Sequence, residues 1–340
     1  MIAFMTEGGN KIGMGHFLRC FGIADKLMEL GEDVCYIIPP DADKSFPESK
    51  GFKIYVLDPV EGAVWNTDEA IEILLKSGAD TVIADSYRLS KEDFAQVRNV
   101  CRLIYLDDLD TYDCNADAVI NFNPGADAAK YRQFDVPGRN VYAGVEYYPL
   151  RREFEGKRKT FISADVKRVL LTSGSTDPEE CILQILNGIE PVFYSSIEFE
   201  ILTGMYFSDD YKDRLKNFCK TNANVKVLPW GDRVSDVLAE ADLLITPGSS
   251  MVMEGLSLNV PCITYEFVDN HHETVKWLDE LEMTAAFGKL GKEIAADNIR
   301  SIFDKELDPD VRIKRSETYS KSFDGKGLDR VADIIRKRSV

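Results

Sequence analysis

Long apolar runs are missing from this sequence. A helix that spans a bilayer needs about 20 mostly apolar residues, and no run in the 340 residues approaches that length. The first five residues are apolar, but they are too few for a signal peptide and no basic residue precedes them. We therefore expect a soluble, cytoplasmic protein with no membrane span.

Paired cysteines are missing as well. The seven cysteines are scattered singly, and no two of them form a CxxC pair. This pattern argues against a disulfide framework and is typical of reduced thiols in a protein core. A chain of this length can bury a core without disulfides or a metal.

Basic residues are fewer than acidic ones in this sequence. Lys and Arg number 41 against 58 Asp and Glu, which gives a net charge of −17. Nucleic acids and anionic membranes bind basic surfaces, so we expect neither as a partner. One local pocket for a small anion is compatible with this charge. The 44% apolar and 29% charged residues are ordinary for a globular enzyme.

Short apolar segments alternate with amphipathic ones along the whole chain. Repeated strand-then-helix units of this kind predict parallel sheets with helices on both faces. The expected strands are residues 2–5, 34–38, 54–57, 81–84, 103–106, 118–121, 141–143, 166–172, 199–202, 225–228, 243–246 and 262–265.

Helices are expected between these strands. The apolar positions from Phe17 to Met28 follow a period of 3.6 residues, and Gly31 stands where a C-terminal cap belongs. Three helices are expected after the last strand. The other expected helices are residues 67–76, 91–100 and 209–220, and two that start at Pro178 and Ser250.

At about 150 residues per domain, the length predicts two domains. The charged segment at 146–159 is the best linker, so we expect domains at 1–150 and 151–320. The fold class is α/β, with two Rossmann-like, doubly wound parallel-sheet domains that face a central cleft. By analogy, a helix in 321–340 crosses back to the first domain. In such sheets ligands bind beyond the carboxyl ends of the strands.

A glycine-containing loop follows the first expected strand. It reads GGNKIGMGH at residues 8–16 and matches neither the dinucleotide pattern nor the P-loop. Gly13 and Gly15 let the backbone approach a ligand, and His16 on the first helical turn can accept a proton from water. An ordinary glycine turn before a helix explains the same residues. The chain has only three histidines, which favours a functional role for this one.

Polar residues also follow the expected strands at 81–84 and 103–106. Asp85-Ser86-Tyr87 comes after the first strand, where it either lines the cleft or forms a helix-capping turn. The run DDLD at residues 107–110 comes after the second. Asp108 and Asp110 suit a Mg²⁺ ion that holds a nucleotide diphosphate, although an acidic turn is much commoner. We predict no metal and no cofactor.

One strand-to-helix loop in the second half reads SGSTDP at residues 173–178. Gly174 and Ser175 can offer backbone N–H groups and a hydroxyl to a phosphate at the helix start. A plain capped helix explains the same loop, because Asp177 fits the N-cap and Pro178 fits the first helical position.

A second such loop reads PGSSMVME at residues 247–254. Gly248, Ser249 and Ser250 lie at a helix start, which makes them a second candidate anion site. Glu254 lies about one turn later, where a carboxylate can accept hydrogen bonds from both ribose hydroxyls. Together the two loops predict a nucleotide diphosphate pocket that needs no basic side chains.

The run DNHHE at residues 269–273 follows the last expected strand. Adjacent histidines on a helix point about 100° apart, and no HExxH spacing exists, so a zinc site is not expected. Asn270 either caps the next helix or reaches the substrate.

In this order, the motifs resemble the PseG family, the UDP-2,4-diacetamido-2,4,6-trideoxy-β-L-altropyranose hydrolases of pseudaminic acid biosynthesis. That family is related in fold to the MurG-like GT-B glycosyltransferases and includes SpsG-type spore-coat and surface-polysaccharide proteins. The resemblance runs from Gly13 to about Gly288. It is carried by IGMGH at 12–16 with Arg19, DSY at 85–87, DDL at 107–109, YPLRREF at 148–154, Ser249-Ser250 with Glu254, and Asn270.

The resemblance implies a GT-B-like fold and a UDP-sugar hydrolase. It implies that His16 is the general base that activates water, with Tyr87 and Asn270 in the substrate site. Hydrolysis at the sugar C1 would be metal-independent, would invert the anomeric carbon and would release UDP. The first domain would hold the sugar and the water, and the second would hold UDP. The predicted binding residues are Gly13, Gly15, Arg19, Asp85, Gly174, Ser175, Gly248, Ser249, Ser250 and Glu254.

The sequence departs from this family in its second half. Where the family usually has GGSD and an Asn-Gln pair, this chain has SGSTD at 173–177 and Asn270-His271. The nucleotide or the sugar substituents can therefore differ from those of the named substrate.

Two other functions remain open. One is a GT-B glycosyltransferase with an acceptor in place of water, although the first half has no strongly basic apolar helix for a lipid-linked acceptor. The other is a non-catalytic nucleotide-sugar-binding protein. The oligomeric state cannot be predicted from these residues.

Overall fold

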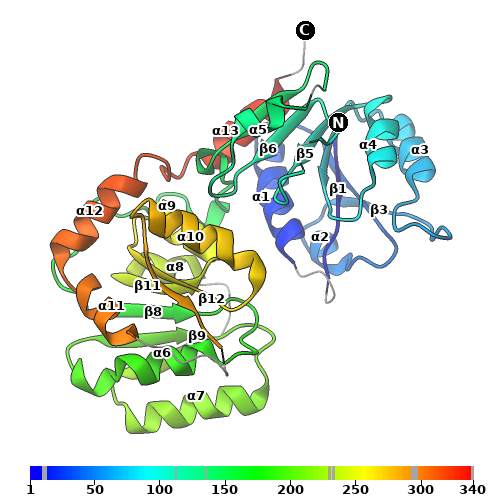
Figure 1. Cartoon of the computed structure of the whole chain (residues 1–340). Helices are drawn as coiled ribbons and strands as arrows, with labels where there is room; N and C mark the ends of the chain where they lie inside the picture. Colours follow the sequence, from blue (N-terminus) through cyan, green and yellow to red (C-terminus); the bar gives the residue numbers. More distant parts are fainter. Residues whose placement is uncertain are drawn as a thin grey trace. The chain divides into compact units, whose positions relative to one another are not determined.

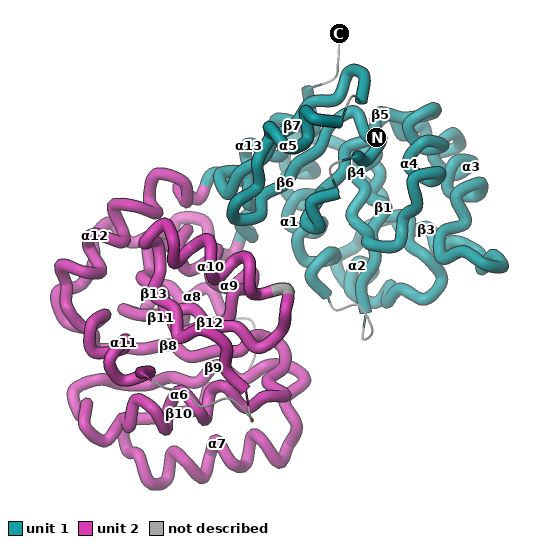
Figure 2. Tube along the Cα trace, viewed as in Figure 1, with its two compact units in different colours: residues 1–152, 326–340 teal, residues 153–325 magenta. Residues whose placement is uncertain are grey.

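A computed structural model describes residues 1–9, 14–111, 113–134, 136–228, 231, 234–291 and 298–337. The chain forms two compact units (Figure 2). Unit 1 consists of Met1–Arg152 and Lys326–Val340, and unit 2 of Glu153–Gly325.

Unit 1 is built on a seven-stranded parallel sheet with the order β3-β2-β1-β4-β5-β6-β7. The strand order reverses between β1 and β4, the kind of switch point at which open α/β sheets bind ligands. At the centre of β1, Phe4 pairs with Tyr36 of β2 and Ile83 of β4. The strands are β1 (Ile2–Thr6), β2 (Val34–Ile38), β3 (Lys53–Val56), β4 (Thr81–Asp85), β5 (Arg102–Leu106), β6 (Ala118–Asn121) and β7 (Asn140–Ala143).

Helices cover both faces of this sheet. Phe4 and Met5 of β1 point to opposite faces and join different apolar clusters. The cluster around Phe4 includes side chains of α1 (Gly15–Glu29) and α13 (Gly327–Arg336), which pack against each other (Figure 1). The helices on the Met5 face are α3 (Thr67–Ser77), α4 (Lys91–Arg98) and α5 (Ala128–Arg132). The short segments are α2 (Ser45–Ser49), η1 (Val145–Tyr147) and η2 (Arg152–Phe154).

Unit 2 is built on a six-stranded parallel sheet with the order β10-β9-β8-β11-β12-β13. Its switch point lies between β8 and β11, where Leu171 pairs with Ile245. The strands are β8 (Arg168–Thr172), β9 (Glu198–Leu202), β10 (Val225–Leu228), β11 (Leu243–Pro247), β12 (Cys262–Glu266) and β13 (Ala285–Lys289).

The helices of unit 2 also lie on two faces. One face packs against α6 (Cys181–Ile189), α7 (Asp209–Thr221) and α11 (Ile299–Glu306). On the other face α9 (Ser250–Ser257) lies so close that a Cβ at Gly255 would come within 2.7 Å of Leu244 and 3.0 Å of Cys262. The remaining segments are α8 (Val234–Glu240), α10 (His272–Glu280), α12 (Pro309–Tyr319), η3 (Pro191–Phe193) and η4 (Asp269–His271).

The predicted α/β architecture of two Rossmann-like parallel-sheet halves is confirmed, with local corrections. The helix expected from Pro178 begins at Cys181. Within its described residues, the segment after β12 contains the edge strand β13 and the four helices α10 to α13, where three helices were expected. Among the helices within the described ranges, none has the length and hydropathy that crossing a membrane requires.

Candidate functional site

Polar side chains gather in unit 1 where three adjacent strands end. Glu7 follows β1, Asp85 ends β4, and Asp108 follows β5. Because β1, β4 and β5 are adjacent and parallel, their carboxyl ends lie at one edge of the sheet. The helix α1 starts at Gly15, so its second residue, His16, joins this edge.

His16 and Asp85 form a buried pair. The exposed fractions of these residues are 3% and 1%, and Nδ1 of His16 lies 2.7 Å from Oδ1 of Asp85. Burial raises the pKa of Asp85, but the charge of Arg19 and the hydrogen bonds from Arg19 and His16 outweigh it. They hold that pKa well below its usual range. The ionised carboxylate can accept the Nδ1–H of a neutral imidazole, which leaves the lone pair of Nε2 able to take a proton.

Arg19 lies one turn after His16 and points into the protein. Its Nε donates to Oδ2 of Asp85 at 2.6 Å, and its Nη2 donates to Oδ1 of Asp85. Its Nη1 donates to Oδ2 of Asp108 at 2.5 Å. The sequence predicts Arg19 and Asp85 as substrate-binding residues, whereas the structure places their polar atoms against each other and around His16.

Tyr87 lies on the solvent side of this group. Its ring meets that of His16 edge-on, with 4.4 Å between the centroids, and its hydroxyl donates to Oδ2 of Asp108 at 2.8 Å. Burial and the negative charge of Asp108 raise the pKa of Tyr87, so the phenol keeps its proton. The structure therefore brings together His16, Arg19, Asp85 and Tyr87 of the predicted site.

Two predicted glycines precede His16. Gly13 lies outside the described residues. Gly15 is the first residue of α1, and a Cβ placed there would have no neighbour within 4 Å among the described residues.

Sequence analysis missed a second buried carboxylate at the same edge, Glu7, which is 1% exposed. Ser86 Oγ donates to its Oε1 at 2.6 Å, and Arg88 Nε donates to its Oε2 at 2.5 Å. Arg88 also pairs with Asp41 at 2.8 and 3.0 Å. The available signal was position, because Glu7 directly follows β1 just as Ser86 directly follows β4.

In unit 2, the start of α6 is occupied by a carboxylate of the chain itself. Asp177 accepts hydrogen bonds from the backbone N–H groups of Cys181 at 2.9 Å and Ile182 at 3.1 Å. It also accepts one from the hydroxyl of Tyr211 at 2.6 Å. A phosphate at this helix start would have to displace Asp177.

The loop that contains Gly174 and Ser175 packs against the segment after β9. A Cβ at Gly204 would collide with the carbonyl oxygens of both residues. These carbonyls therefore point toward unit 2 itself, and a ligand contact at Gly174 and Ser175 stays a prediction.

The start of α9 differs from that of α6. The side chain of its N-cap residue, Ser249, makes no capping hydrogen bond, and Ser250 is exposed. A Cβ at Gly248 would lie 2.7 Å from Val275 Cγ2 and 2.8 Å from the carbonyl oxygen of His271, so only glycine fits there. Glu254, predicted as a ribose contact, lies in the second turn and is 3% exposed.

A buried histidine lies beside this helix start. His271 is 8% exposed, and its Nδ1 has no hydrogen-bond partner among the described residues. A Cβ at Gly248 would come within 3.4 Å of the Cβ of His271. Burial lowers the pKa of His271 to about 4, despite the opposing charge of Glu266, so its imidazole is neutral at pH 7. Asn270 lies in η4, but its side chain falls outside the described part of the chain.

Within the described ranges, no group of three or more His, Cys, Asp or Glu side chains is placed to hold a metal ion. Asp108 instead accepts hydrogen bonds from Arg19 and Tyr87, and Asp110 accepts one from Asn121 at 2.7 Å.

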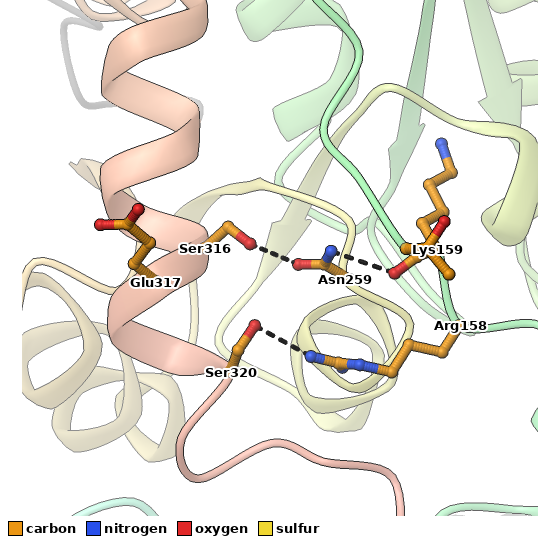
Figure 3. Close-up of a pocket in the computed structure, with 7 residues that line it drawn as sticks. Arg158, Lys159, Asn259, Ser316, Glu317 and Ser320 are labelled. Atoms are coloured by element: carbon orange, nitrogen blue, oxygen red, sulfur yellow. Dashed lines mark hydrogen bonds between the residues drawn. The ribbon is translucent and has the colours of Figure 1, made fainter.

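A cavity of about 470 Å³ lies elsewhere in unit 2, beside α12 (Figure 3). Several of its polar side chains bind each other or the backbone. Ser316 donates to Asn259 at 2.6 Å, Asn259 donates to the carbonyl oxygen of Lys159 at 3.1 Å, and Arg158 donates to Ser320 at 2.9 Å. These bonds tie α12 to the rest of unit 2, and the cavity contains none of the predicted site residues.

Two curated proteins are similar to this chain in sequence, while no family model matches it. An uncharacterised protein of Methanocaldococcus jannaschii is 25% identical over 276 residues, which are 77% of this chain and 54% of that protein. The spore coat polysaccharide biosynthesis protein SpsG of Bacillus subtilis is 20% identical over 223 residues, 65% of each chain. The chain thus matches between about half and two thirds of the length of these relatives.

Solved structures match nearly the whole chain. MurG of Acinetobacter baumannii has a TM-score of 0.70 at 15% identity, with 99% of both chains covered. The glycotransferase of kitacinnamycin has a TM-score of 0.68 at 15% identity, over 99% of this chain and 98% of that one. The UDP-GlcNAc 2-epimerase of Neisseria meningitidis, solved with UDP-GlcNAc, has a TM-score of 0.68 at 12% identity, over 99% and 100%.

These comparisons establish the fold. Two parallel-sheet Rossmann-like units of seven and six strands, in the topology of MurG-like GT-B proteins, account for the whole chain. None of the reported matches tests the resemblance to the PseG family, which stays a prediction.

Proposed function

We propose that this protein is a GT-B enzyme that takes the sugar from a nucleotide sugar in polysaccharide biosynthesis, with His16 as the base. The observation that carries the proposal is the buried His16–Asp85 pair at the start of α1, with 2.7 Å between Nδ1 and Oδ1. A carboxylate that accepts Nδ1–H directs the lone pair of Nε2 outward and stabilises the imidazolium that forms when Nε2 takes a proton.

The reaction that this base serves is a single displacement at the anomeric carbon. The oxygen of an attacking hydroxyl group forms a bond to C1 while its proton moves to Nε2 of His16. The bond between C1 and the diphosphate oxygen breaks, and its electron pair leaves with the nucleotide. Attack opposite the leaving group inverts C1. The negative charge of Asp85 favours the protonated His16 that this step produces.

The leaving diphosphate needs an anion site, and we place it at the start of α9. Backbone N–H groups and the helix dipole favour an anion at such a position. Gly248 lets the backbone there pass close to Val275 and His271, and the imidazole of His271 is neutral. Ser249, Ser250 and Glu254 would complete the nucleotide contacts. In this arrangement unit 2 holds the nucleotide, and unit 1 holds the sugar and the attacking group.

The attacking hydroxyl group belongs either to an acceptor or to water. Transfer to an acceptor is our first choice, because a protein named as a glycotransferase shares the fold and SpsG is named for polysaccharide biosynthesis. Hydrolysis is the second candidate. It is favoured by the motifs around His16, Tyr87 and Asn270, which resemble the PseG hydrolases in sequence order. UDP is the expected nucleotide in both cases.

UDP release separates these two activities. The protein is incubated with UDP-N-acetylglucosamine or UDP-2,4-diacetamido-2,4,6-trideoxy-β-L-altropyranose, with EDTA present, and with or without a polysaccharide-precursor acceptor. Release that requires the acceptor identifies a transferase, whereas equal release without it identifies a hydrolase. Either activity should disappear in His16→Ala.

The matched control is His272→Ala, because the side chain of His272 is 55% exposed and pairs only with Glu266 in the described structure. This variant should keep the wild-type rate. If His16→Ala releases UDP as fast as the wild type, the assignment of the base is wrong. A wild type that binds neither UDP nor these nucleotide sugars would overturn the whole proposal.

A further inference from the structure

Arg19 holds two carboxylates at once, of which only one contacts His16. Its Nε and Nη2 face Asp85, and its Nη1 lies 2.5 Å from Oδ2 of Asp108. The same oxygen of Asp108 accepts the Tyr87 hydroxyl at 2.8 Å, while its Oδ1 has no partner among the described residues. In the described part of the chain, the Asp108 side chain therefore caps no helix and accepts hydrogen bonds only from Arg19 and Tyr87.

Nδ1 of His16 has two competing neighbours. Oδ1 of Asp85 and Nη2 of Arg19 each lie 2.7 Å from it. When Nδ1 carries the ring proton, it donates to Asp85 and Nε2 is unprotonated. When Nη2 of Arg19 donates to Nδ1 instead, the proton of a neutral ring must lie on Nε2. Only the first tautomer can accept a proton at Nε2, so the direction of the guanidinium group decides which nitrogen is the base.

We propose that Asp108 is a positioning residue that keeps His16 in its base-competent tautomer by holding Arg19. The guanidinium group is planar and rigid, so anchoring Nη1 on Asp108 fixes Nε and Nη2 on the two oxygens of Asp85. Asp85 then remains the acceptor for Nδ1–H. The Tyr87 hydroxyl donates to the oxygen of Asp108 that Arg19 uses and thereby holds that carboxylate in place.

Loss of Asp108 leaves the Nη1 end of Arg19 without its anchor. The group can then turn about its side chain and give Nη2 to Nδ1 of His16, which moves the ring proton to Nε2. The charged and titratable groups that face the His16 ring are Arg19 from α1, Asp85 from β4 and Tyr87 from the following loop. Among the described residues, Asp108 makes no hydrogen bond to the ring, and we expect its effect to pass through Arg19.

The test is the tautomer of His16 in Asp108→Ala, measured by ¹⁵N NMR of the imidazole nitrogens at pH 8 in the full chain. Only three histidines are present, and His16→Gln identifies the signals of His16. The control is Asp113→Ala, because Asp113 is an exposed aspartate of unit 1 that pairs with Lys91 at 2.5 Å. We expect Nε2 of His16 to be unprotonated in the wild type and in Asp113→Ala, and largely protonated in Asp108→Ala.

The catalytic consequence rests on the proposed function. If nine tenths of His16 shifts to the wrong tautomer, kcat should fall about tenfold with KM unchanged. Arg19→Lys provides a second variant, because a single ammonium cannot bridge both carboxylates, and it should shift the tautomer in the same direction.

Unchanged ¹⁵N shifts of His16 in a folded Asp108→Ala or Arg19→Lys would overturn the inference. The readout needs no substrate, so it is independent of the proposed function. A tautomer shift in a protein that acts on no nucleotide sugar would uphold the inference and reject the proposed function. An enzyme that acts on a nucleotide sugar but shows no tautomer shift in these variants would support the proposed function and reject the inference.

Discussion

His271→Leu should make the protein more stable while it weakens the binding of UDP. The substitution removes a buried imidazole whose Nδ1 has no partner among the described residues, and it puts an apolar side chain of similar size in its place. A buried polar group without a hydrogen bond costs about 1–3 kcal/mol. The free energy of unfolding at neutral pH and without ligand should therefore rise by an amount within that range.

The pH dependence sharpens this expectation. Burial lowers the pKa of His271 to about 4, whereas a histidine in the unfolded chain has a value of about 6.5. As the pH falls below 6.5, the unfolded state takes up the proton first, so the folded state loses stability until the pH falls below 4. With these two values the loss is about 2 kcal/mol at pH 5 and about 3 kcal/mol at pH 4. His271→Leu should not lose this stability, because it has no imidazole at position 271 to take up the proton.

Urea unfolding at pH 7.5 and pH 5.0 measures both effects. His272→Leu is the control, because the side chain of His272 is 55% exposed. The advantage of His271→Leu over the wild type should widen by about 2 kcal/mol between the two pH values. If the wild type and His271→Leu lose the same stability between the two pH values, the assignment of a neutral, buried His271 is wrong. In calorimetry, an unchanged affinity for UDP would show that His271 does not reach the nucleotide.

Three other substitutions test neighbouring parts of the two sites. Gly248→Ala pushes a Cβ against Val275 and the His271 backbone, which should cost about 1–3 kcal/mol in urea unfolding and weaken UDP binding. Gly15→Ala is the stability control, because a Cβ there has no neighbour within 4 Å among the described residues. An unchanged Kd for UDP in Gly248→Ala would argue against the α9 site. Arg88→Met leaves the buried carboxylate of Glu7 without its cation and should cost about 3–5 kcal/mol. Its control is Arg214→Met, at an ion pair whose side chains are 46% and 23% exposed, which should cost less than about 1 kcal/mol. Equal losses of stability in Arg88→Met and Arg214→Met would contradict the argument. Asp177→Ala removes the carboxylate that caps the start of α6, so its Tm should fall by more than that of Asp209→Ala. Phosphate should raise the Tm of Asp177→Ala more than it raises the Tm of the wild type.

Most strands were predictable, whereas the edge strand β13 was not. Residues 81–84 form a short apolar run, and the structure has β4 there at Thr81–Asp85. The strand β13 reads AAFGK, with Gly288 at a φ of 77° and no β-branched residue, and its register with β12 shifts. Such a segment has little strand propensity of its own and depends on its neighbour.

The start of α6 was misplaced for a similar reason. Asp177 looks like an ordinary N-cap with a proline after it, but it caps N–H groups four and five residues further on. Residue type therefore identified the capping side chain, while only the backbone path between Asp177 and Cys181 fixes where the helix starts.

In unit 1, position after a strand identified His16, Asp85 and Tyr87 as candidates, and the family resemblance added Arg19. Their pairing could not be predicted in the same way. Arg19 contacts carboxylates 66 and 89 positions away in the sequence, and which carboxylates it meets depends on the order in which β1, β4 and β5 assemble. For this reason the sequence predicts Arg19 as a substrate contact, while the structure makes it a partner of Asp85 and Asp108.

The distribution of charge gives a physical reason for separating the base from the anion site. Glu7, Asp85 and Asp108 all lie at the carboxyl edge of the unit 1 sheet, where the guanidinium groups of Arg88 and Arg19 already pair with them and do not offer a diphosphate an unpaired cation. In unit 2, α6 and α9 start at the two strands that flank the switch point, and Asp177 occupies the first of these starts. Of these two helix starts in the described structure, the start of α9 is therefore the one that we propose as the anion site, with neutral His271 beside it. A chain with a net charge of −17 can thus bind a diphosphate through amide groups without a basic surface. We infer that moving a carboxylate to the start of α9, as in Ser249→Asp, would abolish UDP binding and leave the His16–Asp85 pair intact.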